Sequence, residues 1–84
     1  MPKVTARQLL DLLQKQGFKC ALTGRALTPD DCSLDHVVPR SKGGPHEIGN
    51  CQLVVAAANQ AKGTMTHEEF VNLCRDVVRV HGLQ

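Results

Sequence analysis

The segment nearest the start of the chain carries the apolar spacing of an amphipathic helix. Thr5 and Gln8 form a capping-box pattern, in which two side chains satisfy free backbone N–H groups at a helix start. One apolar face follows, made of Leu9, Leu10, Leu12 and Leu13. Gly17 then interrupts the pattern, as glycine commonly does beyond a helix C-terminus. The pattern predicts a helix over residues 5–16.

The last part of the chain repeats this arrangement. Thr66 and Glu69 form a second capping box, and Gly82 follows the last periodic residue. Residues at spacings of three and four form an apolar face: Phe70, Leu73, Cys74, Val77, Val78 and His81. The pattern predicts a second helix over residues 66–81. Both terminal helices are expected to pack against the middle of the chain.

The middle of the chain, residues 18–63, has shorter elements. Three apolar runs have the length and composition of strands: 18–22, 33–38 and 51–55. A polar stretch rich in glycine and proline, residues 39–47, predicts a loop. Residues 56–62 predict a helix too short to be stable unless it packs against other elements. The expected fold class is α+β, a small hairpin-and-helix core flanked by N- and C-terminal packing helices.

The composition indicates a folded domain. With 84 residues, the chain is expected to form one domain, residues 1–84, because a chain of this size cannot bury two hydrophobic cores. Aromatic residues are only 2%, which disfavours proteins that bind single strands or carbohydrates on aromatic surfaces. The sequence has neither an apolar run of about 20 residues nor a signal-peptide pattern. We therefore expect a soluble, cytoplasmic protein with no membrane partner.

The four cysteines are scattered and include no Cys-x-x-Cys pair. An even number permits a secreted framework of two disulfides, but the missing export signal disfavours it. A second alternative is a structural zinc site made of Cys20, Cys32 and Cys51 with a histidine. Their irregular spacing is untypical of zinc sites, which disfavours this alternative as well.

The polar residues that do not fit a packing role fall in the middle section. Asp35 and His36 interrupt the apolar run 33–38. A single histidine in a strand is most often structural, but the adjacent aspartate and the basic, glycine-rich loop favour a functional role. Asn50 lies where the loop rejoins an apolar run, a place where asparagine is most often a turn or cap residue.

Two further polar residues, Asn59 and Lys62, lie one turn apart on the predicted short helix and therefore share a face. Asn50 and Asn59 would point to opposite sides of one continuous helix. They can serve a common site only if the chain breaks between them. The predicted strand 51–55 supplies that break.

In order and spacing, these residues resemble the HNH endonuclease family, the ββα-metal nucleases. The matching segments are 35–39 (DHVVP), 41–44 (SKGG), Asn50, 52–54 (QLV) and 59–63 (NQAKG). The stretch from Lys62 to Phe70 is also similar to members of the family, so the resemblance covers about residues 20–70. It implies a ββα-metal fold and metal-dependent hydrolysis of DNA phosphodiester bonds.

The resemblance also implies a role for each matching polar residue. His36 would be the general base that takes a proton from the attacking water. Asp35 and Asn59 would bind one divalent metal ion, which polarises the phosphate. Asn50 would fix the loop and orient the base. Because both metal ligands offer oxygen, Mg²⁺ or Mn²⁺ is expected, with Zn²⁺ as an occupant that would engage His36 and inhibit.

Several basic side chains surround the matching segments: Arg40, Lys42, His46 and Lys62. Such a cluster is equally typical of a solvated loop, and a net charge of +2 does not by itself indicate a nucleic-acid partner. Beside a site that cleaves phosphodiesters, however, contact with DNA phosphates is favoured. DNA is therefore the expected partner. The sequence leaves the oligomeric state open, and the chain could act within a larger phage or bacterial DNA-processing complex.

One departure from the family is large. Many small HNH domains bind a structural zinc through two Cys-x-x-Cys knuckles, whose positions are occupied here by Cys20, Thr23, Val55 and Ala58. Because three of these residues are not cysteine, we expect no structural zinc and apolar packing in its place. The alternative to a nuclease is a catalytically silent DNA-binding module of the same fold. Retention of all four site residue types favours the enzyme.

Overall fold

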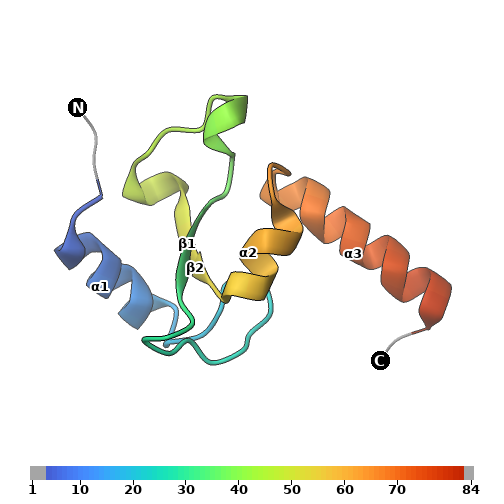
Figure 1. Ribbon diagram of the computed structural model, residues 1–84, viewed down its shortest axis with the longest axis horizontal. Coiled ribbons are helices and arrows are strands. Elements are labelled where there is room, and N and C mark those ends of the chain that lie inside the picture. Colours follow the sequence, from blue (N-terminus) through green and yellow to red (C-terminus); the bar gives the residue numbers. More distant parts are fainter. Residues whose placement is uncertain (1–3, 83–84) are drawn as a thin grey trace.

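A computed structural model describes residues 4–82 of the chain as a small α+β fold (Figure 1). The elements in chain order are helix α1 (Ala6–Lys15), strand β1 (Ser33–His36), two short 3-10 helices η1 (Arg40–Lys42) and η2 (Ile48–Asn50), strand β2 (Cys51–Val54), helix α2 (Ala56–Lys62) and helix α3 (His67–His81). The two strands form an antiparallel sheet between α1 and α2. The molecule is elongated, with extents of 43 × 28 × 19 Å.

Both predicted capping boxes are confirmed. At the start of α1, the Thr5 hydroxyl accepts from Gln8 N at 3.1 Å, and Gln8 Oε1 accepts from Thr5 N at 2.9 Å. At the start of α3, Thr66 and Glu69 make the same reciprocal pair of bonds, at 3.1 and 2.8 Å. The predicted terminal helices therefore begin where the sequence indicated, because their start signals are local.

The register of the sheet sorts the polar residues onto two faces. Asp35 lies opposite Gln52, and His36 lies opposite Cys51. Consecutive strand residues point to opposite faces, whereas directly opposite residues share a face. Asp35 and Gln52 thus define what we call the Asp35 face, and His36 and Cys51 define the His36 face.

The core lies around β2 and the start of α2. Its buried members are Cys20, Leu27, Leu53, Val54, Val55 and Ala58, against which leucines of α1 pack. Three of the four zinc-knuckle positions, at residues 20, 55 and 58, lie in this one cluster, so apolar packing does occupy the place of the knuckles. Cys20 Sγ accepts hydrogen bonds from Thr23 N and Val55 N, at 3.4 and 3.3 Å. All four cysteines are free thiols in the structure.

The predicted strand at 18–22 is wrong. Phe18 has a φ of 60°, a left-handed conformation that a strand residue does not adopt. Only Lys19 makes an isolated bridge, to Ala26, before the chain turns. The hairpin is therefore built from β1 and β2 alone, and a long loop joins them.

The strand predicted at 33–38 is real but ends earlier, at His36. Beyond that residue, the backbone N–H and carbonyl of Val38 bond to the side chain of Asn50 instead of to a strand. The carbonyl of Val37 accepts from the backbone N–H of His67, at the start of α3. Partners from other segments thus replace the sheet ladder.

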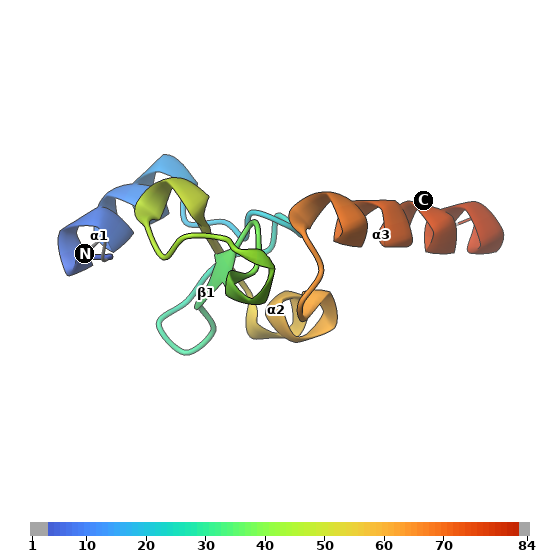
Figure 2. The same ribbon diagram turned by 90° about the horizontal axis from the view of Figure 1, so that it is seen from above.

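The C-terminal helix does not pack as predicted. No residue of α3 is buried, and Leu73, Val77, Val78 and Val80 are 45–72% exposed. Figures 1 and 2 show α3 extending away from the sheet, with only its first turn near the rest of the fold. The apolar face of α3 was predicted correctly, but too little of the chain lies beside the helix to cover that face. Within residues 4–82, no helix has both the length and the apolar character that crossing a membrane requires.

Helix α1 is joined to the sheet by the side chain of Gln16, directly after its last turn. Gln16 Oε1 accepts from Leu53 N at 2.9 Å, and Gln16 Nε2 donates to Leu53 O at 2.9 Å. The amide therefore binds the outer edge of β2 as a neighbouring strand would. It satisfies backbone groups of a buried residue, which would otherwise be costly to leave unpaired.

We expect Gln16→Ala to lower the free energy of unfolding by about 1–3 kcal/mol, because it leaves the Leu53 N–H without a partner and removes one of the two donors to the Leu53 carbonyl, which keeps the Ala21 N–H. Gln14→Ala is the matched control, since Gln14 is exposed on the same helix. Chemical denaturation followed by circular dichroism measures both variants. Equal stability of the two would contradict the role assigned to Gln16.

Candidate active site

A cleft of about 290 Å³ lies where β1 ends, between the following loop and α2. Its lining includes Asp35, His36, Arg40, Ser41 and Asn59. The structure therefore brings together the predicted base, both predicted metal ligands and one predicted DNA contact. Asn59 reaches the cleft because α2 packs against β1 after the break that β2 supplies. Within residues 4–82, the Asn59 side chain makes no hydrogen bond, so its amide is free to bind a ligand.

Asp35 is the most constrained residue of the cleft. Its side chain is 4% exposed, and its two oxygens accept from different donors. Lys62 Nζ donates to Oδ1 at 3.0 Å, and Gln52 Nε2 donates to Oδ2 at 2.8 Å. The ring of His67 lies 3.3 Å from Gln52 Nε2. Each oxygen of the buried carboxylate thus has one hydrogen-bond donor, and Lys62 balances its charge, as a buried charge requires.

Lys62 does not lie where a DNA contact would be. Its side chain is 0% exposed, and Nζ donates both to Asp35 and to the backbone carbonyl of His36, at 2.9 Å. An ammonium group held in this way cannot reach a phosphate in solution. The prediction of a phosphate contact by Lys62 is therefore wrong, since the side chain instead fastens α2 to β1.

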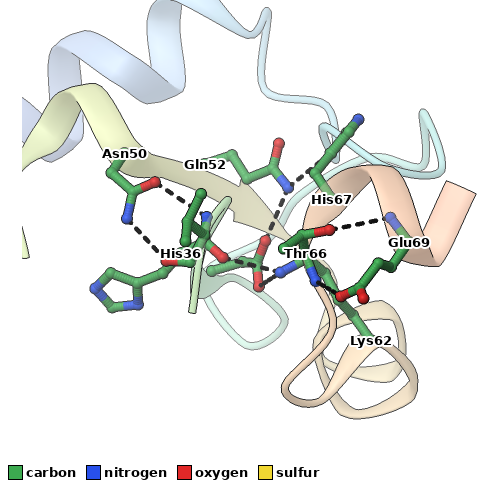
Figure 3. A network of polar contacts seen from close by, with 9 residues as sticks. His36, Asn50, Gln52, Lys62, Thr66, His67 and Glu69 are labelled. Atoms are coloured by element: carbon green, nitrogen blue, oxygen red, sulfur yellow. Dashed lines mark hydrogen bonds and ion pairs between the residues drawn. The ribbon is translucent and has the colours of Figure 1, made fainter. Parts of the chain in front are cut away.

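His36 lies on the other face of the sheet. Figure 3 shows its ring directed away from Gln52, Lys62 and His67. Its Nε2 lies 2.9 Å from Nδ1 of His46, and the two ring centroids are 5.2 Å apart. Burial lowers the pKa of His36, and the nearby His46 and Arg40 lower the pKa further. The ring is therefore uncharged at neutral pH, which is the form that can accept a proton.

Asn50 holds the loop that follows β1. Its Oδ1 accepts from Val38 N, and its Nδ2 donates to the carbonyls of Val38 and Pro45, all at 3.0 Å. Gly44 packs so closely here that a Cβ would lie 1.8 Å from the Val38 carbonyl oxygen and 2.9 Å from Asn50 Nδ2. A side chain at position 44 would push the loop off its anchor. The side chain of Asn50 thus bonds to the backbone of the loop and does not point into the cleft to take part there (Figure 3).

The remaining predicted DNA contacts differ in availability. Arg40 is exposed at the cleft, and it forms no ion pair with any residue in the range 4–82. Lys42 is paired with Glu69 of α3, with Nζ and Oε1 2.6 Å apart. The hydrogen bond from Lys42, with the Thr66 backbone N–H, lowers the pKa of Glu69 to about 2. His46 is engaged with His36. Arg40 is therefore the side chain best placed to meet a phosphate.

A second set of potential metal ligands lies on the His36 face. One ring nitrogen each from His36 and His46, and Sγ of Cys51, all lie within 4.8 Å of one another. Cys51 is 7% exposed, and its thiol donates to the Glu47 carbonyl at 3.2 Å. Burial, with the charge of Asp35, raises the pKa of the Cys51 thiol. This set shares no ligand with the oxygen donors of Asp35 and Asn59. His36 belongs to this set and also lines the cleft that holds those donors.

Comparison with known proteins supplies the family. The family model described as HNH endonuclease matches residues 17–65, which is more than half of the chain. The chain belongs to the HNH endonuclease family. Its structure is also similar to that of the type II-C Cas9 enzyme from Actinomyces naeslundii, with a TM-score of 0.71 and 27% sequence identity over 88% of this chain. The chain spans only 8% of that protein's length. No curated protein matches it.

Within this HNH fold, Gln52 and His67 had no assigned role in the sequence analysis. Cys51 was considered there only as a ligand of a disfavoured structural zinc site. Gln52 and Cys51 become visible as partners of Asp35 and His36 only once the register of β1 against β2 is known. His67 lies in the first turn of a helix that was expected to serve packing only. A correct register for the hairpin was the signal that could have found Gln52 and Cys51.

We expect Lys62→Met to destabilise this HNH fold by about 3–5 kcal/mol, because it leaves the buried carboxylate of Asp35 without its cation. Lys15→Met is the matched control, since Lys15 is an exposed lysine in the last turn of α1 and its change should stay within about 0.5 kcal/mol. Adding Asp35→Leu to Lys62→Met should recover much of the loss. If Lys62→Met and Lys15→Met had the same free energy of unfolding, the importance of the ion pair would be contradicted.

Proposed function

We propose that the chain is a metal-dependent endonuclease that hydrolyses DNA phosphodiester bonds. The observation that carries this proposal is the cleft that collects Asp35, His36, Asn59 and Arg40. Membership of the HNH endonuclease family supports the reaction class. In this proposal DNA is the partner, and the cleft receives one phosphate of its backbone.

The oxygen donors at the cleft fit a divalent metal ion. Each oxygen of Asp35 accepts one hydrogen bond, and a carboxylate oxygen has a second lone pair. The Asn59 amide oxygen is uncommitted within the described residues, 4–82. Carboxylate and amide oxygens with waters suit Mg²⁺ or Mn²⁺. When bound, such an ion would polarise the phosphate and stabilise the charge on the leaving oxygen.

The chain's own residues supply the other parts of the reaction. His36, uncharged at neutral pH, accepts the proton of the attacking water. The tautomer that suits this role carries its proton on Nε2 and donates it to His46 Nδ1, which leaves His36 Nδ1 as the acceptor. Arg40 binds a phosphate oxygen at the rim of the cleft. Asn50 keeps the loop, and with it Arg40 and His46, in place.

A catalytically silent DNA-binding module is the second candidate, and the two contacts made by the site residues favour it. Asp35 is already neutralised by Lys62, and His36 already contacts another ring. A module that only binds DNA would need neither residue free. The two candidates differ in one measurable outcome, which is whether supercoiled plasmid is cut in the presence of Mg²⁺ or Mn²⁺.

We expect the purified protein to cut supercoiled plasmid with Mg²⁺ or Mn²⁺ and to stop when EDTA removes the metal. His36→Ala should lower the rate by about 10²–10⁴-fold, which is the usual contribution of a general base. His81→Ala is the matched control, because His81 is exposed at the end of α3. Circular dichroism checks that both variants fold. Wild-type protein that binds the plasmid and never cuts it would establish the silent module instead.

The assignment of Asn59 as a metal ligand makes a separate prediction. Asn59→Ala should weaken Mn²⁺ binding and slow cleavage together, whereas Gln60→Ala, at an exposed neighbour on α2, should change neither. Asn59→His should shift the metal preference toward Ni²⁺ and Zn²⁺, since imidazole is a softer ligand than an amide oxygen. Mn²⁺ binding followed by electron paramagnetic resonance separates affinity from rate. Fastest cleavage by the wild type with Zn²⁺ would overturn the assignment.

A further inference from the structure

The cluster on the His36 face carries an inference beyond the oxygen-donor site. We propose that His36, His46 and Cys51 form a second metal site, selective for Zn²⁺, and that an ion bound there inactivates the base. The binding of zinc stands on the cluster alone. The loss of activity rests on the proposed function, in which His36 accepts the proton.

The fold assembles the three ligands by two independent means. The strand register places Cys51 directly opposite His36, so that both side chains lie on one face of the sheet. The loop between η1 and η2 brings His46 to the same place, and Asn50 anchors that loop through the Pro45 carbonyl. One ligand atom from each residue then lies within 4.8 Å of the other two.

The chemistry of these ligands selects the ion. Two imidazole nitrogens and one thiolate are the ligands that zinc prefers, whereas Mg²⁺ and Mn²⁺ prefer oxygen. Three protein ligands leave a fourth position of the tetrahedron for water. The Cys51 thiol, which now donates to the Glu47 carbonyl, releases its proton to solvent when the sulfur binds the ion.

The geometry is close to what zinc requires. Zn–N bonds of about 2.0–2.1 Å and a Zn–S bond of about 2.3 Å place tetrahedral ligand atoms about 3.3–3.6 Å apart. The two ring nitrogens, now 2.9 Å apart, would open by a few tenths of an ångström, and the sulfur would move closer to them. His46 is half-buried on a loop outside the helices and strands, so it can make this adjustment.

Zinc at this site would block proton transfer at His36. A neutral imidazole that binds a metal through one nitrogen carries its proton on the other nitrogen. Neither nitrogen can then accept a proton from water. The two metal sites share no ligand, but both need His36: as the proton acceptor beside one site and as a ligand of the other.

Binding is tested without any assay of activity. Co²⁺, a spectroscopic substitute for Zn²⁺, should bind the wild-type protein at one ion per chain and give a near-ultraviolet thiolate-to-cobalt absorption band, which Zn²⁺ then displaces. Cys51→Ser should abolish the band, and His46→Gln should weaken binding by more than about tenfold. Cys74→Ser is the control, because Cys74 is an exposed cysteine on α3, and it should keep the band. Circular dichroism checks that each variant is folded.

The effect on activity is tested in parallel. Plasmid cleavage with saturating Mg²⁺ is titrated with Zn²⁺, and each variant is compared with its own zinc-free rate. The wild type and Cys74→Ser should be inhibited at the zinc concentrations that displace Co²⁺, and Cys51→Ser should resist at least about tenfold more zinc.

The possible outcomes separate the two halves of the proposal. A thiolate band that survives in Cys51→Ser, or its absence from the wild type, overturns the zinc site. A band that depends on Cys51, together with cleavage that zinc does not inhibit, supports the zinc site and overturns the inactivation. Protein that cuts no plasmid at all refutes the proposed function, while the cobalt result still decides whether the site binds metal.

Discussion

The ion pair between Asp35 and Lys62 is the interaction on which the site depends. It lies in the interior, with the two side chains 4% and 0% exposed, and it is the polar link between β1 and α2. A buried pair of this kind adds little net stability, but breaking it is costly, because one charge would then remain without a partner. The position of α2, and therefore of Asn59 beside the cleft, is fixed by the requirement that Lys62 reach Asp35.

The buried carboxylate of Asp35 also fixes the register of the hairpin. Asp35 accepts from Gln52, its direct neighbour across the sheet, so a shift of β2 by one residue would remove a donor from a buried carboxylate. The same shift would take Cys51 away from His36. One constraint on the Asp35 face therefore determines which residues meet on the His36 face, and the sheet needs only two short strands to present both sets of chemistry.

The sequence predicted best those features that depend on neighbouring residues. The capping boxes at Thr5 and Thr66, the short helix α2 and the membership of the HNH family were all correct. The errors concern contacts between distant segments. A lysine one turn after Asn59 looks like a surface cation until β1 is placed beside it, and the apolar face of α3 indicates packing without showing what could cover it. The link between Gln16 and Leu53 joins residues 37 positions apart and leaves no local pattern.

The position of His36 at the end of β1 explains why one residue can belong to two sites. Its backbone carbonyl is bound by Lys62 on the Asp35 face, while its ring lies on the opposite face beside His46. His46 therefore determines whether the His36 ring can accept a proton. Under the proposed mechanism, His46 would be the hydrogen-bond acceptor and would fix the tautomer that a general base needs. As a second ligand to zinc, it would remove that tautomer. In the proposed enzyme, the contact that orients the base is thus also the contact through which zinc would inactivate it.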